Sequence, residues 1–463
     1  MTLISGDFGM WGNRKRLDKS DLPFSDKYIF MLMIPMIIET FLNVFIGIAD
    51  TIMVSSAGEA AISGVSVVDS LILLFTLVIT CFSSGGAVVF SQHLGARNED
   101  AAKKAGRLLL QISFLLGVLG SVMILAFRNF FLHLLMGNAE EAVMEAAIDY
   151  LIPIALSLPF LAITSSATAL SRSMGQSKIA MLIALLMNVL NVIGNAILIY
   201  IYGMGALGAG IASLFSRIVA ALVMIWILYS DRLPLKIDNL VHIQFDIKLV
   251  ESILHIAVPT TLENGVFHIG KLIIMGIVAS LGTTAMAANA AVNSLITIVT
   301  LPGVAMNMAI IPLVSHCCGA GRYDQAEYYA KKILSWQYIA FLMVCPPFLF
   351  CMRPCLSMYN LGPDALDLAV HCFFLLALHT LLFWPVSFAL PSCLEAAGDV
   401  IYPMVLAIVS MWVFRVGNGY VLSVRLDYGL IGVQWAMFFD WYCRIIFLVG
   451  RFLSGKWKNR KVI

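Results

Sequence analysis

Runs of roughly 20 apolar residues recur along the whole chain, and each is long enough to cross a bilayer as a helix. Lipid offers no hydrogen-bond partner to the backbone, and a helix satisfies its own N–H and C=O groups within one segment. The low charge agrees with a bilayer as the solvent, because only 12% of the residues are Asp, Glu, Lys or Arg, against about 25% in a soluble domain. The sequence therefore predicts an all-α membrane protein.

We count twelve such runs in the 463 residues, six in each half of the chain. In the first half they are expected at 28–53, 61–91, 106–127, 147–172, 177–202 and 206–229. In the second half they are expected at 250–280, 285–316, 331–352, 364–394, 400–424 and 429–453. The chain is therefore expected to cross the membrane twelve times.

The basic residues predict the orientation. If the N-terminus lies in the cytoplasm, 22 of the 29 Lys and Arg fall in segments on the cytoplasmic side, and outer loops hold only Arg128, Arg353 and Arg425. This bias follows the positive-inside rule and predicts both termini in the cytoplasm of a protein in the cell (plasma or inner) membrane. The first residues show no signal-peptide pattern. Since orientation explains the basic residues, no nucleic-acid partner is expected.

The chain repeats itself at a distance of 224 residues. The stretch SQHLGARNEDAAKK begins at Ser91, and a similar stretch, SHCCGAGRYDQAEYYAKK, begins at Ser315. An ordered series of matches indicates an internal duplication of six spans. Six is even, so both halves enter the membrane from the same side, a plan found in transporters that bind substrate between their halves. The repeated loop itself is expected to have a structural role. Further pairs at this offset are Pro35 and Pro259, Glu39 and Glu263, and Gly95 and Gly319.

This duplication sets the expected division of the chain. Each half is expected to form a six-helix bundle, with polar segments at the two ends and between the halves. The expected parts are a cytoplasmic N-terminal segment at 1–27, a bundle at 28–230, a cytoplasmic linker at 231–249, a bundle at 250–453 and a cytoplasmic tail at 454–463.

Four stretches, in order along the duplicated chain, carry a family resemblance. They are IADTIMVSSAGEAAISG (48–64), the paired SQHLGA and SHCCGA loops, ALSRSMGQSK (169–178) with its echo SCLEAAGDV (392–400), and LNVIGNAILIY (190–200) followed by GALGAGIAS (205–213). Over essentially its whole length the chain resembles the multidrug and toxic compound extrusion (MATE) transporters.

The resemblance implies a fold and an activity. The fold would be two parallel-repeat six-helix bundles around a central cavity. The activity would be antiport, in which small organic, cationic or amphipathic compounds leave the cell as Na⁺ or H⁺ enters. No cofactor beyond the coupling ion and no macromolecular partner beyond the lipid bilayer are expected, and the protein is expected to function as a monomer.

Asp50 matches the acidic residue that the family carries on its first span at a cation site. The resemblance adds Asn191 and Asn195 from the fifth span and Ser213 from the sixth. The two asparagines are four residues apart and share one helix face. Their oxygens, with the carboxylate and the hydroxyl, suit a hard cation such as Na⁺, whereas a proton could use Asp50 alone. The alternative for Asp50 is a solvated or capping residue at a helix end.

Two departures from the family pattern bear on which ion binds and on which half of the chain binds it. Some members carry a second acid where Asn195 stands, so the single formal charge here is compatible with sodium. The duplicate half does not keep the site, and the acid that sodium-coupled members carry on the tenth span is replaced by Trp384. The residues at the positions of Asp50, Asn191 and Ser213 are Ile274, Phe414 and Met437, and Asn418 alone echoes Asn195.

Glu39 and Glu263 are repeat-related acids, each four residues after a proline. Ionisable groups are costly inside a membrane, so both are expected to line a cavity, where they would bind cationic substrates or relay protons. The alternative is a buried Glu bonded to a neighbouring helix. Lys271, two turns beyond Glu263 on the same span, is expected to line the cavity with these acids and to neutralise Glu263 or another carboxylate.

Other function classes have less support. The chain has no HExxH or GxSxG motif, and its nine cysteines show no metal-binding spacing, so neither an enzyme nor a metal site is expected beyond a possible Na⁺. The second candidate is a flippase for a lipid-linked precursor, whose cavity should hold several Arg or Lys. Away from the cytoplasmic ends of the predicted spans, the only basic residues within them are Arg217, Lys271, Arg415 and Arg444, and Arg444 is expected to pair with Asp440 four residues earlier. Cationic cargo is therefore expected.

Overall fold

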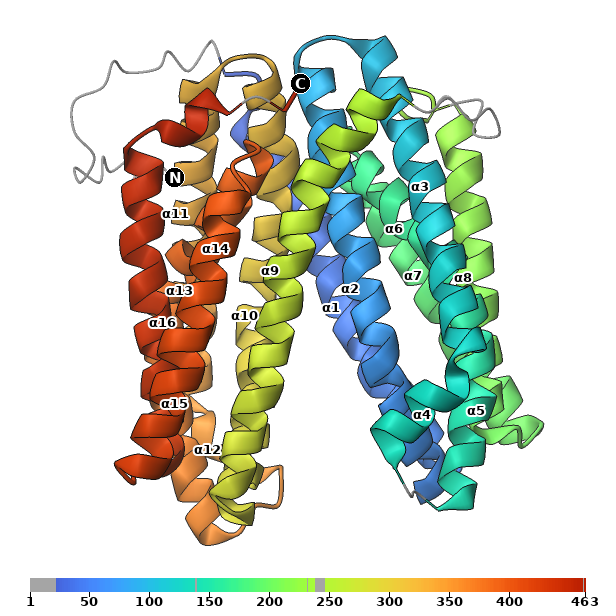
Figure 1. The fold of residues 1–463 in the computed structure, drawn as a ribbon, viewed down its shortest axis with the longest axis vertical. Helices are drawn as coiled ribbons and strands as arrows, with labels where there is room; N and C mark the ends of the chain where they lie inside the picture. The colour runs from blue at the N-terminus through green and yellow to red at the C-terminus, as the bar shows by residue number, and fades with distance from the viewer. Residues whose placement is uncertain (1–21, 138–139, 231, 238–245, 461) are drawn as a thin grey trace.

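The computed structural model describes residues 22–137, 140–230, 232–237, 246–460 and 462–463. Over these ranges the chain is almost entirely helical, and no strand occurs in them (Figure 1). Most of the predicted N-terminal segment and part of the predicted linker lie outside the described residues.

The helices of the first half form one bundle (Figure 1, blue to green). They are α1 (Asp26–Ser55), α2 (Glu59–Gly95), α3 (Glu99–Ala126), α4 (Arg128–Met136), α5 (Glu141–Leu156), α6 (Leu158–Ser173), α7 (Ser177–Asn195), its π-helical continuation η2 (Ala196–Ile201), and α8 (Gly205–Tyr229).

The helices of the second half form the other bundle (Figure 1, yellow to red). They are α9 (Ile247–Ser280), α10 (Thr283–Gly319), α11 (Tyr323–Phe350), α12 (Met352–Ser357), α13 (Pro363–Ala396), α14 (Ile401–Ser410), the π-helical η3 (Met411–Gly417), α15 (Asn418–Tyr420), the π-helical η4 (Val421–Arg425), α16 (Gly429–Leu453) and the short 3₁₀ turn η5 (Lys456–Asn459).

Each of the twelve predicted spans coincides with one helix or with consecutive helices of this order. In the described part of the chain, ten helices are long and apolar enough to cross a membrane, and α5 with α6 makes an eleventh. The twelfth, α16, has 25 residues and carries Asp440 and Arg444, which lower its apolarity. The all-α membrane architecture is confirmed, and the order of the helices is consistent with twelve spans.

The span predicted as one helix at 147–172 is broken. Its two halves, α5 and α6, meet at Ser157 and are bent by 46°. Pro159 stands in the first turn of α6, where its missing N–H costs nothing, whereas in an unbroken helix its ring would crowd the carbonyl four residues earlier. The bend therefore follows from a proline that the sequence displays.

Small residues bring the two bundles into contact. A Cβ atom on Gly85 of α2 would lie 3.0 Å from the backbone nitrogen of Ala257 in α9, so the two helices pack backbone to backbone there. Such close packing by small residues is how helices associate in a bilayer. The bundles converge at the end where α2 and α10 finish and diverge toward the opposite end (Figure 1). The repeated loops, which follow these two helices, therefore lie where the bundles meet.

Candidate functional site

The four residues expected to hold a coupling ion lie together in the first bundle. The amide nitrogen of Asn195 donates a hydrogen bond to Asp50 Oδ1 (2.6 Å) and lies 3.3 Å from Asn191 Oδ1. The amide nitrogen of Asn191 donates to Ser213 Oγ (3.0 Å). A continuous hydrogen-bonded chain thus links α1, α7 and α8, and its members are buried or half-buried.

Local packing explains why these helices come so close. Asn191 and Asn195 stand one turn apart on α7, and Gly194 lies between them. A Cβ atom on Gly194 would lie 2.8 Å from Ala212 Cβ, so α7 and α8 touch beside Ser213. The short separation lets an asparagine side chain reach a serine on the next helix.

Further charged residues surround this hydrogen-bonded series of side chains, and the sequence alone predicted no role for them there. Asp69 of α2 accepts a hydrogen bond from the hydroxyl of Tyr150 (2.9 Å). Arg217 of α8 donates to Ser157 Oγ (2.6 Å) and interacts electrostatically with both Asp50 and Asp69. Two carboxylates and one guanidinium leave a net negative charge, which favours a cation. Asp69 could have been found as an acid inside a predicted span.

The oxygen atoms of the chain fit a hard cation. Asn195 is fully buried, and its carbonyl Oδ1 has no hydrogen-bond partner among the residues that the structure describes. A buried acceptor without a partner costs about 1–3 kcal/mol, and a bound cation would remove that cost. No group of three or more His, Cys, Asp and Glu with metal-binding geometry occurs in the described ranges. Any ion here would rely on amide, hydroxyl and carboxylate oxygens.

The repeat-related acids Glu39 and Glu263 occupy different surroundings. Glu39 of α1 is buried, and its Oε1 accepts a hydrogen bond from Arg172 of α6 in an ion pair of 2.8 Å. It does not line the cavity of about 520 Å³ in the second bundle, whereas Glu263 does. Because Arg172 lies 133 positions after Glu39 in the sequence, only the tertiary structure could identify the two as partners.

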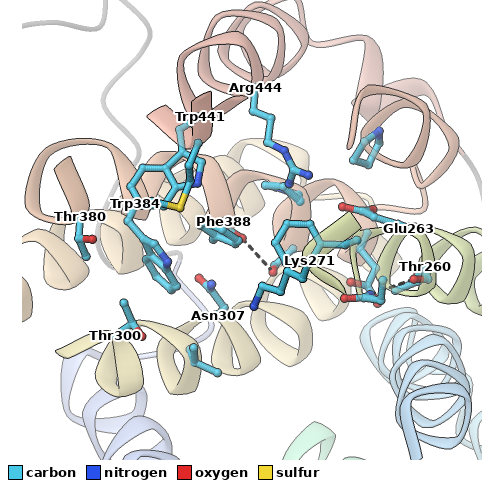
Figure 2. Close-up of a pocket in the computed structure, with 18 of the residues that line it drawn as sticks. Thr260, Glu263, Lys271, Thr300, Asn307, Thr380, Trp384, Phe388, Trp441 and Arg444 are labelled. Carbon is cyan, nitrogen blue, oxygen red and sulfur yellow. Dashed lines mark hydrogen bonds between the residues drawn. The ribbon is translucent and has the colours of Figure 1, made fainter. Parts of the chain in front are cut away.

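A cavity of about 520 Å³ lies in the second bundle (Figure 2). Every residue that lines it belongs to the second half of the chain, from α9, α10, α13, α14, η3 and α16 or the turn before α14. Among the residues expected to have a role, Glu263 and Lys271 line it, and so does Trp384. Glu395 lines it too, and its Oε1 accepts a hydrogen bond from Ser84 of the first bundle (2.7 Å).

The basic residues of the second bundle converge on this cavity. Lys271, Arg415 and Arg444 all line it, although they are up to 173 positions apart. The predicted pair of Arg444 and Asp440 is confirmed, with Nε and Oδ1 3.2 Å apart, and Arg415 Nη1 lies 3.5 Å from the other oxygen of Asp440. Lys271 makes no ion pair with Glu263 or with another residue that the structure describes, contrary to its expected role. Its ammonium instead lies over the ring of Phe267.

Comparison with known proteins gives consistent results. Residues 35–197 and 259–421 each match the family model described as MatE, and the two matches begin 224 residues apart. The chain is 25% identical over 458 residues to the probable multidrug resistance protein NorM of Thermotoga maritima, covering 96% of each chain. It is 24% identical over 334 residues to the FAD transporter of Shewanella oneidensis, covering 69% of this chain and 71% of the relative. The fold matches a solved structure described as "Crystal structure of MATE in the straight conformation", with a TM-score of 0.86, 21% identity and coverage of 94% and 97% of the two chains.

Proposed function

The chain belongs to the MatE family of multidrug and toxic compound extrusion transporters, and from this premise we propose that it exports small organic compounds in exchange for a cation bound at Asp50. It is a multi-pass membrane transporter and not an enzyme. Its relatives are described as a multidrug resistance protein and as an FAD transporter, which supports small organic cargo here.

The observation that carries the coupling is the hydrogen-bonded chain from Asp50 to Ser213. Binding or release of a cation changes the charge at Asp50 and the hydrogen bonds that tie α1 to α7 and α8. The other half of α1 packs on the second bundle, where Met33 and Met36 belong to one core with Ala309 of α10. Because α1 thus contacts both bundles, a change at Asp50 can alter how the bundles sit against each other.

The oxygen ligands favour Na⁺ as the coupling ion. Na⁺ needs several oxygen atoms, and the unpartnered carbonyl of Asn195 supplies one beside the carboxylate of Asp50. A proton would need the carboxylate alone. Proton coupling is therefore the other outcome that the experiment below must distinguish.

The remaining features of the proposal follow the family and the sequence. The protein would act as a monomer in the cell membrane, with both termini in the cytoplasm. Flipping of a lipid-linked precursor is the less favoured function, because the relatives reported above are described as a multidrug resistance protein and an FAD transporter.

Transport in proteoliposomes tests the proposal. Purified full-length protein would be reconstituted, and movement of fluorescent organic compounds would be followed under a Na⁺ gradient and, separately, under a proton gradient. We expect transport under the Na⁺ gradient that is lost in Asp50→Asn. Glu59→Gln, which changes an exposed acid at the start of α2, is the matched control and should transport normally. Absence of transport under both gradients, in protein shown to be folded, would overturn the proposal.

A further inference from the structure

Three cationic side chains surround one aromatic ring in the wall of the second-bundle cavity. They come from α9, η3 and α16, and all three line the cavity. Figure 2 labels two of them, Lys271 and Arg444. The ring centroid of Phe267 lies 5.2 Å from Lys271 Nζ, 5.3 Å from Arg415 Cζ and 5.5 Å from Arg444 Cζ. Each distance lies within the range of a cation–π contact. We call Lys271, Arg415 and Arg444 the basic cluster.

The acids in contact with the basic cluster do not balance its charge. Asp440 is shared by both arginines, so one carboxylate faces two guanidinium groups. Lys271 has no carboxylate within ion-pair distance among the residues that the structure describes. Glu263 acts on Arg444 electrostatically but makes no ion pair with it in the described ranges. The wall of the cavity therefore carries an excess of positive charge around Phe267.

Several buried donors of this wall also lack a hydrogen-bond partner. Arg415 is 9% exposed, Arg444 is 4% exposed and Trp441 is 4% exposed. Arg415 Nη1, Arg444 Nη2 and Trp441 Nε1 make no hydrogen bond to any described residue, and nitrogen atoms of these types can only donate. Leaving such donors unsatisfied away from water is costly. The side chains that carry these donors line the cavity, so a small rearrangement of them would let acceptor atoms of a ligand satisfy the donors.

The rest of the wall is aromatic. Trp384 and Phe388 stack with ring centroids 4.7 Å apart, and Phe388 meets Trp441 edge to face at 6.2 Å. All three line the cavity, whose volume of about 520 Å³ is that of a typical small-molecule site. The cavity therefore offers aromatic surface for a flat ring system beside charged donors for an anionic group.

We propose that this cavity binds aromatic organic anions, with a phosphate or carboxylate group held by Lys271, Arg415 and Arg444 and the ring system against Trp384, Phe388 and Trp441. Guanidinium groups pair well with the oxygens of such anions. The inference names the cargo of the proposed exporter and rests on that function. It replaces the expectation of cationic cargo, which assumed that basic residues in the spans were too few to line a cavity.

The two glutamates of the cavity are consistent with this binding mode. Glu263 and Glu395 both line it and would repel an anionic group placed beside them. The anionic group of a ligand is therefore expected to bind at the basic cluster and away from these two glutamates. A substrate would thus enter in one orientation, with its charged group toward Phe267.

Binding of a matched pair of probes tests the proposal. Riboflavin 5′-phosphate and riboflavin share one fluorescent ring system, and only the first carries a phosphate. Both would be titrated against purified full-length protein in detergent, with quenching of flavin fluorescence as the signal. We expect the phosphate form to bind at least about tenfold more tightly, since hydrogen bonds to charged groups are the stronger ones. Equal affinities, or tighter binding of the cation ethidium, would overturn the inference.

Substitutions test whether the basic cluster is what binds the phosphate group of the probe. Lys271→Gln removes a cation that forms no ion pair in the described structure, so the fold should survive. This substitution should weaken binding of riboflavin 5′-phosphate about tenfold and leave the affinity for riboflavin unchanged. Arg425→Gln changes an exposed arginine on η4 outside the cavity and is the matched control. Unchanged binding of the phosphate probe in Lys271→Gln would count against the proposed site.

Two further experiments are needed. The first distinguishes a lipid headgroup from a small organic anion as the ligand, and the second distinguishes failure of the proposed cargo from failure of the proposed export. Binding of the protein to nanodiscs of phosphatidylglycerol, but not of phosphatidylcholine, together with no binding of the flavin phosphate, would mean that the site takes a lipid headgroup and would overturn the small-molecule proposal. In proteoliposomes, transport of ethidium without transport of the flavin phosphate would overturn the cargo class while leaving export intact. Binding of the flavin phosphate without any driven transport would overturn export and support the site.

Discussion

The backbone of Gly95 in α2 lies directly against the carbonyl group of His316 in α10. A Cβ atom on Gly95 would clash with the carbonyl oxygen of His316 and lie 2.8 Å from its carbonyl carbon. The contact is reciprocal, because a Cβ on Gly319 would lie 2.5 Å from the Cα of Gln92. Gly319 and His316 stand 224 positions after Gly95 and Gln92. The sequence is repeated here because each half supplies the same glycine to one symmetric contact between the bundles.

The contact predicts that Gly319→Ala forces the bundles apart at this end. Cys317 and Cys318 are buried beside it and serve as natural reporters. We expect maleimide labelling of these two cysteines in purified protein, mapped by mass spectrometry, to become several-fold faster. Gly450→Ala is the control, since a Cβ there would meet nothing within 4 Å. Labelling of Gly319→Ala at the wild-type rate would show that the contact does not hold this end closed.

Asp50→Asn should reduce cation-driven export to background while leaving the fold intact. The substitution keeps the size of the side chain but removes the negative charge from the hydrogen-bonded chain. Gradient-driven transport in proteoliposomes measures the loss, and thermal unfolding in detergent checks the fold. Normal driven export by this variant would exclude Asp50 as the coupling residue.

Asn195→Ala should weaken Na⁺ binding about tenfold, because it removes a buried carbonyl oxygen that has no partner in the described structure. Equilibrium binding of radioactive sodium to the purified protein measures the affinity. Asn188→Ala is a suitable control, since Asn188 is a buried asparagine of the same helix and makes no hydrogen bond to Asp50. If wild type binds no sodium at all, the site takes a proton instead.

Breaking the ion pair of Glu39 and Arg172 should destabilise the first bundle. Arg172→Met alone leaves a mostly buried carboxylate without its partner, and such losses cost about 3–5 kcal/mol. The double variant Glu39→Gln with Arg172→Met should recover a large part of that stability, since neither charge remains. Unfolding in a denaturing detergent measures both variants. Additive effects of the two substitutions would mean that the pair contributes no coupling energy.

Asp440→Asn should tighten binding of riboflavin 5′-phosphate and lower stability at the same time. Asp440 is the carboxylate shared by Arg415 and Arg444, so its neutralisation frees both guanidinium groups for a ligand and leaves them repelling each other without one. We expect affinity to rise about tenfold and thermal stability to fall in the absence of the probe. Weaker binding would mean that Asp440 positions the arginines for the anion.

Much of the candidate ion site could be anticipated because its residues match family motifs. Asp50, Asn191, Asn195 and Ser213 lie on three helices, yet each stands in a recognisable stretch of sequence. Asp69 belongs to no such motif and was missed, although it is an acid inside a predicted span. The bend between α5 and α6 could also have been anticipated from Pro159.

The sequence by itself determined the membrane class, the twelve spans and the duplication, because apolar length decides what can cross a bilayer and repeated positions survive as a pattern. Only the tertiary structure decided that Lys271, Arg415 and Arg444 meet around Phe267. The physical reason is that lipid and protein interior are both apolar, so an apolar span does not reveal which face it turns inward. The rotation of each helix, and hence the charge of the cavity, follows from how the helices pack.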